Sequence, residues 1–217
     1  MKKKSIYLMP GMAASPKIFE LIKFPEQFDI HNLFWIPPFK NEKLSDYALR
    51  MSKKINVKKP ILIGVSFGGL LVQEISKIIE CEKLIIISSI KSKSELPIHM
   101  KMANRTKVHN LLPLEWIKNI ENLVLFVFGD LIKTKINLYE KYLSERDPEY
   151  LKWAINAIVS WDQDYIIDSI IHIHGIRDNI FPIRFIKEPI LKIKGSHAII
   201  LTQANWFNKN LFELISD

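Results

Sequence analysis

The sequence predicts an α/β protein with a mainly parallel sheet of about six strands, flanked by helices. Short apolar segments without polar–apolar alternation, typical of strands buried on both faces, are followed by amphipathic segments with helical spacing. The two kinds of segment alternate through residues 6–88, as in proteins with parallel strands and crossover helices. The chain has 217 residues, 48% of them hydrophobic. This is sufficient for one domain with a sizeable core, so we expect a single domain over 1–217.

The first part of the chain supplies four strands and three helices. Residues 6–9 form an apolar strand that ends at Pro10-Gly11. Ser15-Pro16 predicts the start of an amphipathic helix, because serine suits the N-cap and proline the first helical position. The later segments are a strand over 28–36, a helix over 44–55, a strand over 60–65, a helix over 67–79 and a strand over 83–88.

The alternation breaks between residues 91 and 168, where most of the pattern is helical. Helices are predicted over 138–143 and 150–161, and Asp147-Pro148 is a start signal for the second. Residues 119–133 are apolar but do not alternate. The stretch is too long for a loop and is predicted to be a helical insertion beside the site. Strands return over 169–174 and 189–194, and a last helix is predicted over 204–215.

The charge of the chain is basic but scattered. Lys and Arg total 31 against 23 Asp and Glu, a formal charge of +8. The lysines form no stripe and accompany no recognisable nucleic-acid-binding module, so no nucleic-acid partner is expected. Salt-sensitive retention on heparin or anionic lipid would indicate otherwise. No uninterrupted apolar run of about 18 residues occurs, so no membrane span is expected.

Two further features bear on the compartment. The apolar run after the first lysines is cut by Pro10-Gly11, which makes it too short for a signal peptide. Cys81 is the single cysteine, so no intrachain disulfide can form, which fits a reducing, cytoplasmic location. Its neighbours Glu80 and Glu82 disfavour the thiolate, so Cys81 is expected to be unreactive.

The strongest chemical signal is the sequence Gly-Val-Ser-Phe-Gly-Gly at residues 64–69. It matches G-x-S-x-G and stands between a predicted strand and a predicted helix. A sharp strand-to-helix turn of this kind exposes the serine hydroxyl above the sheet in a strained backbone conformation. Gly64 and Gly68 avoid side-chain collisions at the turn, and Gly69 allows close packing of the helix. Ser66 is therefore the candidate nucleophile.

A serine nucleophile requires a base and a group that orients it. Asp178 follows one predicted strand end and His197 follows the next, so both should lie at the same edge of the sheet as Ser66. The weaker candidates for the acid are Asp130, Asp162, Asp164 and Asp168. The other histidines are His172 and His174, without a metal-ligand cluster around them, and His31, His99 and His109, without an obvious partner. His174 is better explained as a support for the acid loop. Ser88, Ser89 and Ser196 lie near strand ends and either line the site or serve in turns.

These segments together resemble the α/β-hydrolase family over nearly the whole chain. They are the first turn at 9–12, the serine turn at 64–69, the acid loop at 174–182 and the histidine loop at 195–197. The resemblance implies a short member that lacks the family's first β-hairpin. It also implies an oxyanion hole built from the backbone N–H groups of Met12 and Phe67, with Ala13 as the alternative to Met12. The family's first turn often reads His-Gly, whereas here it reads Pro10-Gly11, which leaves open how the turn is held.

The resemblance implies a serine hydrolase that acts on a small-molecule acyl substrate, a carboxylic ester by default, and needs no cofactor or metal. Amides, thioesters, lactones and carbon–carbon bonds stay open, as does the oligomeric state, because the fold hosts many reactions. The alternative is a catalytically inactive ligand-binding protein on the same scaffold. The aromatic residues of the insertion either pack against the sheet or form a lid over an apolar pocket; they include Trp116, Phe126, Phe128, Trp153 and Trp161.

Overall fold

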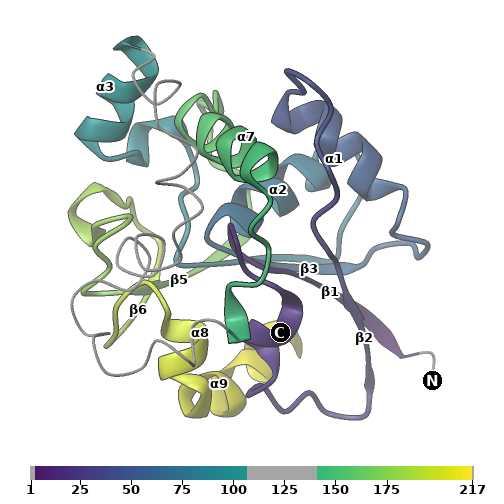
Figure 1. Ribbon diagram of the computed structural model, residues 1–217. Helices are drawn as coiled ribbons and strands as arrows, with labels where there is room; N and C mark the ends of the chain where they lie inside the picture. Colours follow the sequence, from purple (N-terminus) through teal and green to yellow (C-terminus); the bar gives the residue numbers. More distant parts are fainter. Residues whose placement is uncertain (1–2, 107–140, 217) are drawn as a thin grey trace.

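The computed structural model of the protein describes residues 3–106 and 141–216, and its centre is a six-stranded sheet (Figure 1). All five strand pairings are parallel, and the strand order is β2-β1-β3-β4-β5-β6. The predicted α/β class and the predicted number of strands are confirmed. The strands are β1 (Lys4–Met9), β2 (Phe28–Asn32), β3 (Ile61–Val65), β4 (Lys83–Ile87), β5 (Ile170–Gly175) and β6 (Leu191–Ile193).

Helices cover both faces of the sheet, as Figure 1 shows, with α1 and α2 on one side and α8 and α9 on the other. The central strand β3 is buried at every position, which explains why it is apolar on both faces. No helix within 3–106 or 141–216 has the length and apolar character needed to cross a membrane. The helices are η1 (Pro16–Phe19), α1 (Leu44–Ser52), α2 (Phe67–Ser76), η2 (Lys93–Glu95), α3 (Ile98–Thr106), α7 (Pro148–Val159), η5 (Ile183–Phe185), α8 (Ile199–Thr202) and α9 (Ala204–Ser216).

Several predicted elements in the first part of the chain are shorter in the structure. The helices predicted over 44–55 and 67–79 end at Ser52 and Ser76. The helix expected from Ser15-Pro16 is only the short 3₁₀ helix η1, and the Ser15 side chain makes no capping hydrogen bond that would support a longer one. The strand expected over 28–36 ends at Asn32. Its partner β1 is followed by Pro10, which has no N–H to continue the ladder, so the chain leaves the sheet after Asn32.

The segment between the neighbouring strands β4 and β5 contains the helices η2, α3 and α7 in the part that the structure describes. Helix α7 begins at Pro148, and Asp147 caps it, because the Asp147 carboxylate accepts a hydrogen bond of 2.8 Å from the Tyr150 N–H. The predicted start signal is confirmed, and the helix ends at Val159 rather than at residue 161. Some predictions lie outside the described residues: the apolar segment 119–133, most of the helix over 138–143, and Asp130, His109, Trp116, Phe126 and Phe128.

The strand order indicates where on the sheet a ligand would bind. From β1 the chain runs to β2 on one side, and it then crosses to β3 on the other side of β1. In open parallel sheets, ligands bind beyond the carboxyl ends of the strands where the order switches in this way. The residues directly after β1 and β3 include Gly11 and Ser66, so the topology by itself points to the serine turn.

Candidate active site

Ser66 occupies the sharp turn between β3 and α2 with strained backbone angles, φ 53° and ψ −119°. Such angles are costly for a residue with a Cβ and persist only where the surroundings enforce them. Here the Ser66 N–H donates to the Ile87 carbonyl at 2.9 Å, and the Ser66 carbonyl accepts from the Gly69 N–H and the Ser89 hydroxyl, both at 2.8 Å. The end of β4 therefore holds the turn from one side.

The glycines around Ser66 are required by backbone and side-chain neighbours. A Cβ on Gly64 would lie within 3.0 Å of the backbone of Gly68 and Gly69. A Cβ on Gly68 would be equally close to the backbone carbonyls that end β1, and one on Gly69 would meet the Ser89 side chain. The close packing predicted for Gly69 is thus a contact with Ser89, one of the serines that the sequence placed near a strand end.

Ser66, His197 and Asp178 form one hydrogen-bonded chain. The Ser66 Oγ lies 2.8 Å from His197 Nε2, and His197 Nδ1 lies 2.8 Å from Asp178 Oδ2. Asp178 follows β5 and His197 follows β6, so the two side chains come from neighbouring strand ends. Carboxylate oxygens only accept, so Nδ1 carries the proton and Nε2 is free to accept from the serine hydroxyl. The three residues predicted to share one edge of the sheet lie in contact there.

Asp178 is held as a carboxylate although it is buried. Burial by itself would raise the pKa of Asp178, but His197 beside it and the hydrogen bonds it accepts outweigh burial and hold the pKa below its usual value. The second oxygen, Oδ1, accepts from the N–H groups of Ile180 at 2.8 Å and Phe181 at 2.9 Å. With Oδ1 occupied by the backbone, the Oδ2 oxygen is the one available to His197.

The turn after β1 lies against Ser66. A Cβ on Gly11 would come within 3.3 Å of the Ser66 Cβ, and the turn closes through a hydrogen bond from the Ala14 N–H to the Gly11 carbonyl at 3.1 Å. Met12 and Ala13 are its central residues, with Ala13 at a φ of 63°. Phe67 is the first residue of α2, where helix geometry leaves the N–H without an intrahelical acceptor.

Trp35 connects the two turns, and sequence reasoning missed it. Its indole N–H donates to the Gly11 carbonyl at 2.9 Å, and its ring stacks on Phe67 with centroids 4.9 Å apart and planes 8° apart. This contact answers how the first turn is held without the His-Gly sequence. Trp35 lies within the segment predicted as a strand over 28–36. No local sequence pattern predicts that its side chain contacts the turn that follows another strand.

The competing candidates lie elsewhere. Asp162 and Asp164 are exposed and both pair with Lys93, and Asp168 is also exposed. His31 pairs with Asp29 at 2.9 Å, and His99 is exposed on α3. Among the residues that the structure describes, no group of three or more His, Cys, Asp or Glu side chains is arranged to hold a metal.

Ser88 is buried without a hydrogen-bond partner for its hydroxyl, and Ser196 precedes His197. Burial raises the pKa of the Cys81 thiol, in the direction that its acidic neighbours indicated.

Of the five aromatic residues that were candidates for a lid or a core, two are described. Trp153 packs on Tyr47 with centroids 4.4 Å apart, and its indole N–H donates to the Glu42 carbonyl at 2.8 Å. Trp161 donates to the Glu74 carboxylate at 2.7 Å. Both side chains are buried and join α7 to α1 and α2, so these two serve packing.

No protein-family model matches the chain, and no curated protein matches its sequence. Solved structures do resemble it in fold. A hydrolase from Oleispira antarctica has a TM-score of 0.78 at 12% identity, over 99% of this chain and 92% of the other. An esterase from Exiguobacterium antarcticum has a TM-score of 0.75 at 12% identity, over 100% and 94% of the two chains. A lipase-esterase related protein from Clostridium acetobutylicum has a TM-score of 0.71 at 19% identity, over 99% and 96%. The chain has the α/β-hydrolase fold over nearly its full length, as the sequence resemblance implied.

Proposed function

We propose that this protein is a serine hydrolase that cleaves a carboxylic ester, or a related acyl compound, through a triad of Ser66, His197 and Asp178. The observation that carries the proposal is the continuous hydrogen-bonded chain from the Ser66 Oγ through both nitrogens of His197 to Asp178, with both steps at 2.8 Å. The strained backbone at Ser66 supports it further, because strain of this kind is retained where it serves a site. A catalytically inactive binding protein would not need this geometry.

In the proposed reaction His197 Nε2 removes the proton from Ser66 as the Ser66 Oγ attacks the substrate carbonyl carbon. Asp178 stabilises the imidazolium that forms. As the tetrahedral intermediate collapses, the carbon–oxygen bond to the alcohol breaks, and His197 gives its proton to the departing alcohol oxygen. Water, deprotonated by His197, then attacks the acyl-enzyme. This attack forms a second tetrahedral intermediate. When that intermediate collapses, the bond to the Ser66 Oγ breaks, His197 returns the proton to Ser66, and the acid is released.

The negative oxygen of the tetrahedral intermediate requires hydrogen-bond donors that are already in place. Met12 and Phe67 belong to the two turns that meet at Ser66, and we assign this role to their N–H groups; each donor of this kind contributes about 3 kcal/mol in the transition state. Phe67 stands at the first position of α2, where the helix dipole adds a partial positive charge. Since only main-chain atoms are used, the Met12 side chain is no obstacle.

Labelling with a fluorophosphonate probe tests the proposal without knowledge of the substrate. The wild-type protein is expected to be labelled at Ser66, and Ser66→Ala is expected to lose labelling and ester hydrolysis, with a rate at least about 10³-fold lower. Ser76→Ala, at the other end of α2, serves as the matched control and should be labelled like wild type. Folded wild-type protein that is not labelled, or labelling that survives in Ser66→Ala, would refute the triad and favour the binding-protein alternative.

Trp35→Phe is expected to slow labelling of Ser66 by up to about tenfold, because the Gly11 carbonyl loses the indole donor and retains only the Ala14 N–H, a change of roughly 0.5–1.5 kcal/mol. The phenyl ring retains the stacking on Phe67, so the loss reports the hydrogen bond to the turn that carries Met12. Trp206→Phe in α9 is the matched control, since Trp206 packs on Phe207 away from the two turns. Equal labelling rates in the two variants would show that the indole N–H does not matter for the site.

A further inference from the structure

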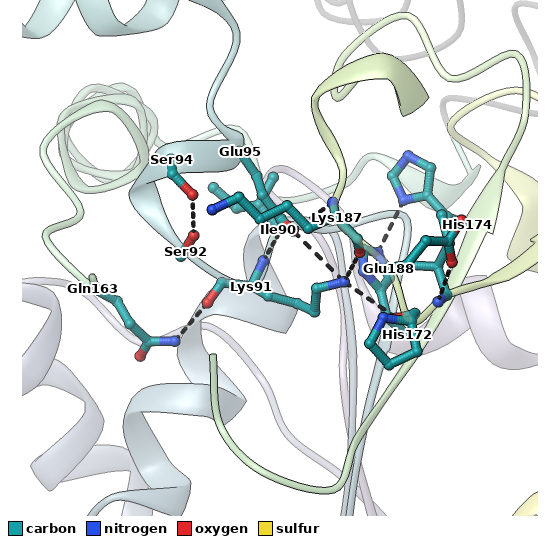
Figure 2. A network of polar contacts seen from close by, with 12 residues as sticks. Ile90, Lys91, Ser92, Ser94, Glu95, Gln163, His172, His174, Lys187 and Glu188 are labelled. Carbon is teal, nitrogen blue, oxygen red and sulfur yellow. Dashed lines mark hydrogen bonds and ion pairs between the residues drawn. The ribbon is translucent and has the colours of Figure 1, made fainter. Parts of the chain in front are cut away.

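A buried pair of histidines on β5 lies behind Asp178. His172 is 2% exposed and His174 0%, and the two alternate along the strand so that both point to the same face. His172 Nε2 lies 3.0 Å from His174 Nδ1. His174 Nε2 lies 2.8 Å from the Phe181 carbonyl oxygen and 3.4 Å from Asp178 Oδ2. Figure 2 shows both rings within a larger network of polar contacts.

The partners of the pair leave only one arrangement of protons. A carbonyl and a carboxylate oxygen only accept, so His174 Nε2 must carry a hydrogen. Burial lowers the pKa of His174, and it lowers that of His172 to well below the usual value, so both rings are neutral. A neutral ring has one N–H, so His174 Nδ1 is an acceptor and His172 must donate to it from Nε2. The pair therefore has a single tautomer.

Lys91 adds to the effect of burial on the pair. It is fully buried, and its ammonium group donates to the Lys187 carbonyl and to the Pro189 carbonyl at 3.2 Å, and lies 3.6 Å from the Glu95 carboxylate (Figure 2). Two carbonyl acceptors and a nearby carboxylate thus surround the buried ammonium ion. Its positive charge lowers the pKa of both histidines further, because a second cation nearby would be repelled.

Phe181 links the pair to the triad. Its N–H donates to Asp178 Oδ1 at 2.9 Å, its carbonyl accepts from His174, and its ring lies edge-on to the His197 ring with centroids 5.8 Å apart. One residue thus contacts both the acid and the base of the triad, and His174 binds its carbonyl. The His174 N–H also directs the positive end of its dipole toward Asp178 Oδ2, the oxygen that His197 uses.

We infer that His174, with its tautomer set by His172, is a positioning residue for the triad: by binding the Phe181 carbonyl it fixes the backbone of Phe181, whose N–H holds the Asp178 carboxylate. The inference rests on the proposed function. His174 touches neither substrate nor Ser66, so its effect must pass through Asp178 and Phe181. A histidine that serves only the stability of β5 would show no such dependence.

Two amide substitutions separate these roles. In His174→Gln the side-chain nitrogen reaches the position of the imidazole Nε2, whereas in His174→Asn it reaches only that of Nδ1. Fluorophosphonate labelling of Ser66 is expected to slow about tenfold to a hundredfold in His174→Asn, because a catalytic group that is misplaced by up to about 1 Å has effects of this order. In His174→Gln the rate is expected to stay within about threefold of wild type. His31→Asn, a surface histidine on β2, is the control.

The same His174→Asn change is then made in Asp178→Ala, with labelling followed over hours. Residues that act as a unit are not additive, so the second change is expected to alter the rate less than about twofold there. Equal rates in His174→Asn and His174→Gln, or an undiminished loss in the Asp178→Ala background, would overturn the inference. Absence of wild-type labelling would instead refute the triad itself, so the two failures are distinguishable.

Far-UV and near-UV circular dichroism monitor folding of each variant. If His174→Asn does not fold, the comparison moves to His172: His172→Gln retains a donor toward His174 Nδ1, and His172→Leu removes it. Slower labelling in the leucine variant alone supports the inference, and equal rates contradict it.

Discussion

Asp178→Asn is expected to reduce kcat for ester hydrolysis by about 10⁴-fold, as the loss of a triad carboxylate does in serine proteases. The geometry of the acid loop gives the reason. Oδ1 accepts two backbone N–H groups, so the asparagine oxygen would stay there and the NH₂ group would replace Oδ2. That NH₂ would face His197 Nδ1, so the imidazole proton would move to Nε2. A protonated Nε2 in a neutral ring cannot accept the proton of Ser66.

Hydrolysis of p-nitrophenyl acetate and the rate of fluorophosphonate labelling measure this effect. Asp162→Asn is the matched control, because Asp162 is exposed and pairs only with Lys93 among its described contacts. The control should behave like wild type, and both variants should retain the unfolding temperature to within a few degrees. An Asp178→Asn variant with a rate within tenfold of wild type would remove Asp178 from the triad.

Gly68→Ala is expected to lower the free energy of unfolding by about 1–3 kcal/mol, the usual cost of overpacking a close contact. Alanine by itself favours a helix over glycine by roughly 1 kcal/mol, but this gain is smaller than the collision. The new Cβ would lie within 3.0 Å of the carbonyl oxygens of Met9 and Pro10, which are main-chain atoms at the end of β1 and cannot rotate away.

The same substitution should slow the labelling of Ser66 by at least about 10²-fold, because a shift of about 1 Å in a positioning element has that effect. The displaced backbone carries Met12 on one side and Phe67 on the other, so both proposed oxyanion donors move apart. Urea unfolding and labelling rates are compared with Ser76→Ala in the last turn of α2. A fully stable and reactive Gly68→Ala protein would show that the two turns tolerate separation.

The order of strands and helices could be predicted because it depends on local patterns. Apolar runs such as 61–65 are buried on both faces, and the Asp147-Pro148 start of α7 is a property of adjacent residues. Boundaries were wrong where a partner strand decided them, as at Asn32, since β2 can extend only as far as β1 has N–H groups to offer. The insertion could be predicted to be helical, but not how it packs.

For the candidate site, the sequence by itself determined the serine turn and the order of Ser66, Asp178 and His197, because each follows the end of one strand. The tertiary structure alone decided what surrounds them. Trp35 reaches Gly11 only because its side chain crosses from one segment to the end of another strand. His174 was predicted to support the acid loop, but the atom that it binds there, the Phe181 carbonyl oxygen, is known only from the structure. Such contacts depend on which strands are neighbours and on the directions of side chains, and neither can be predicted from local sequence periodicity.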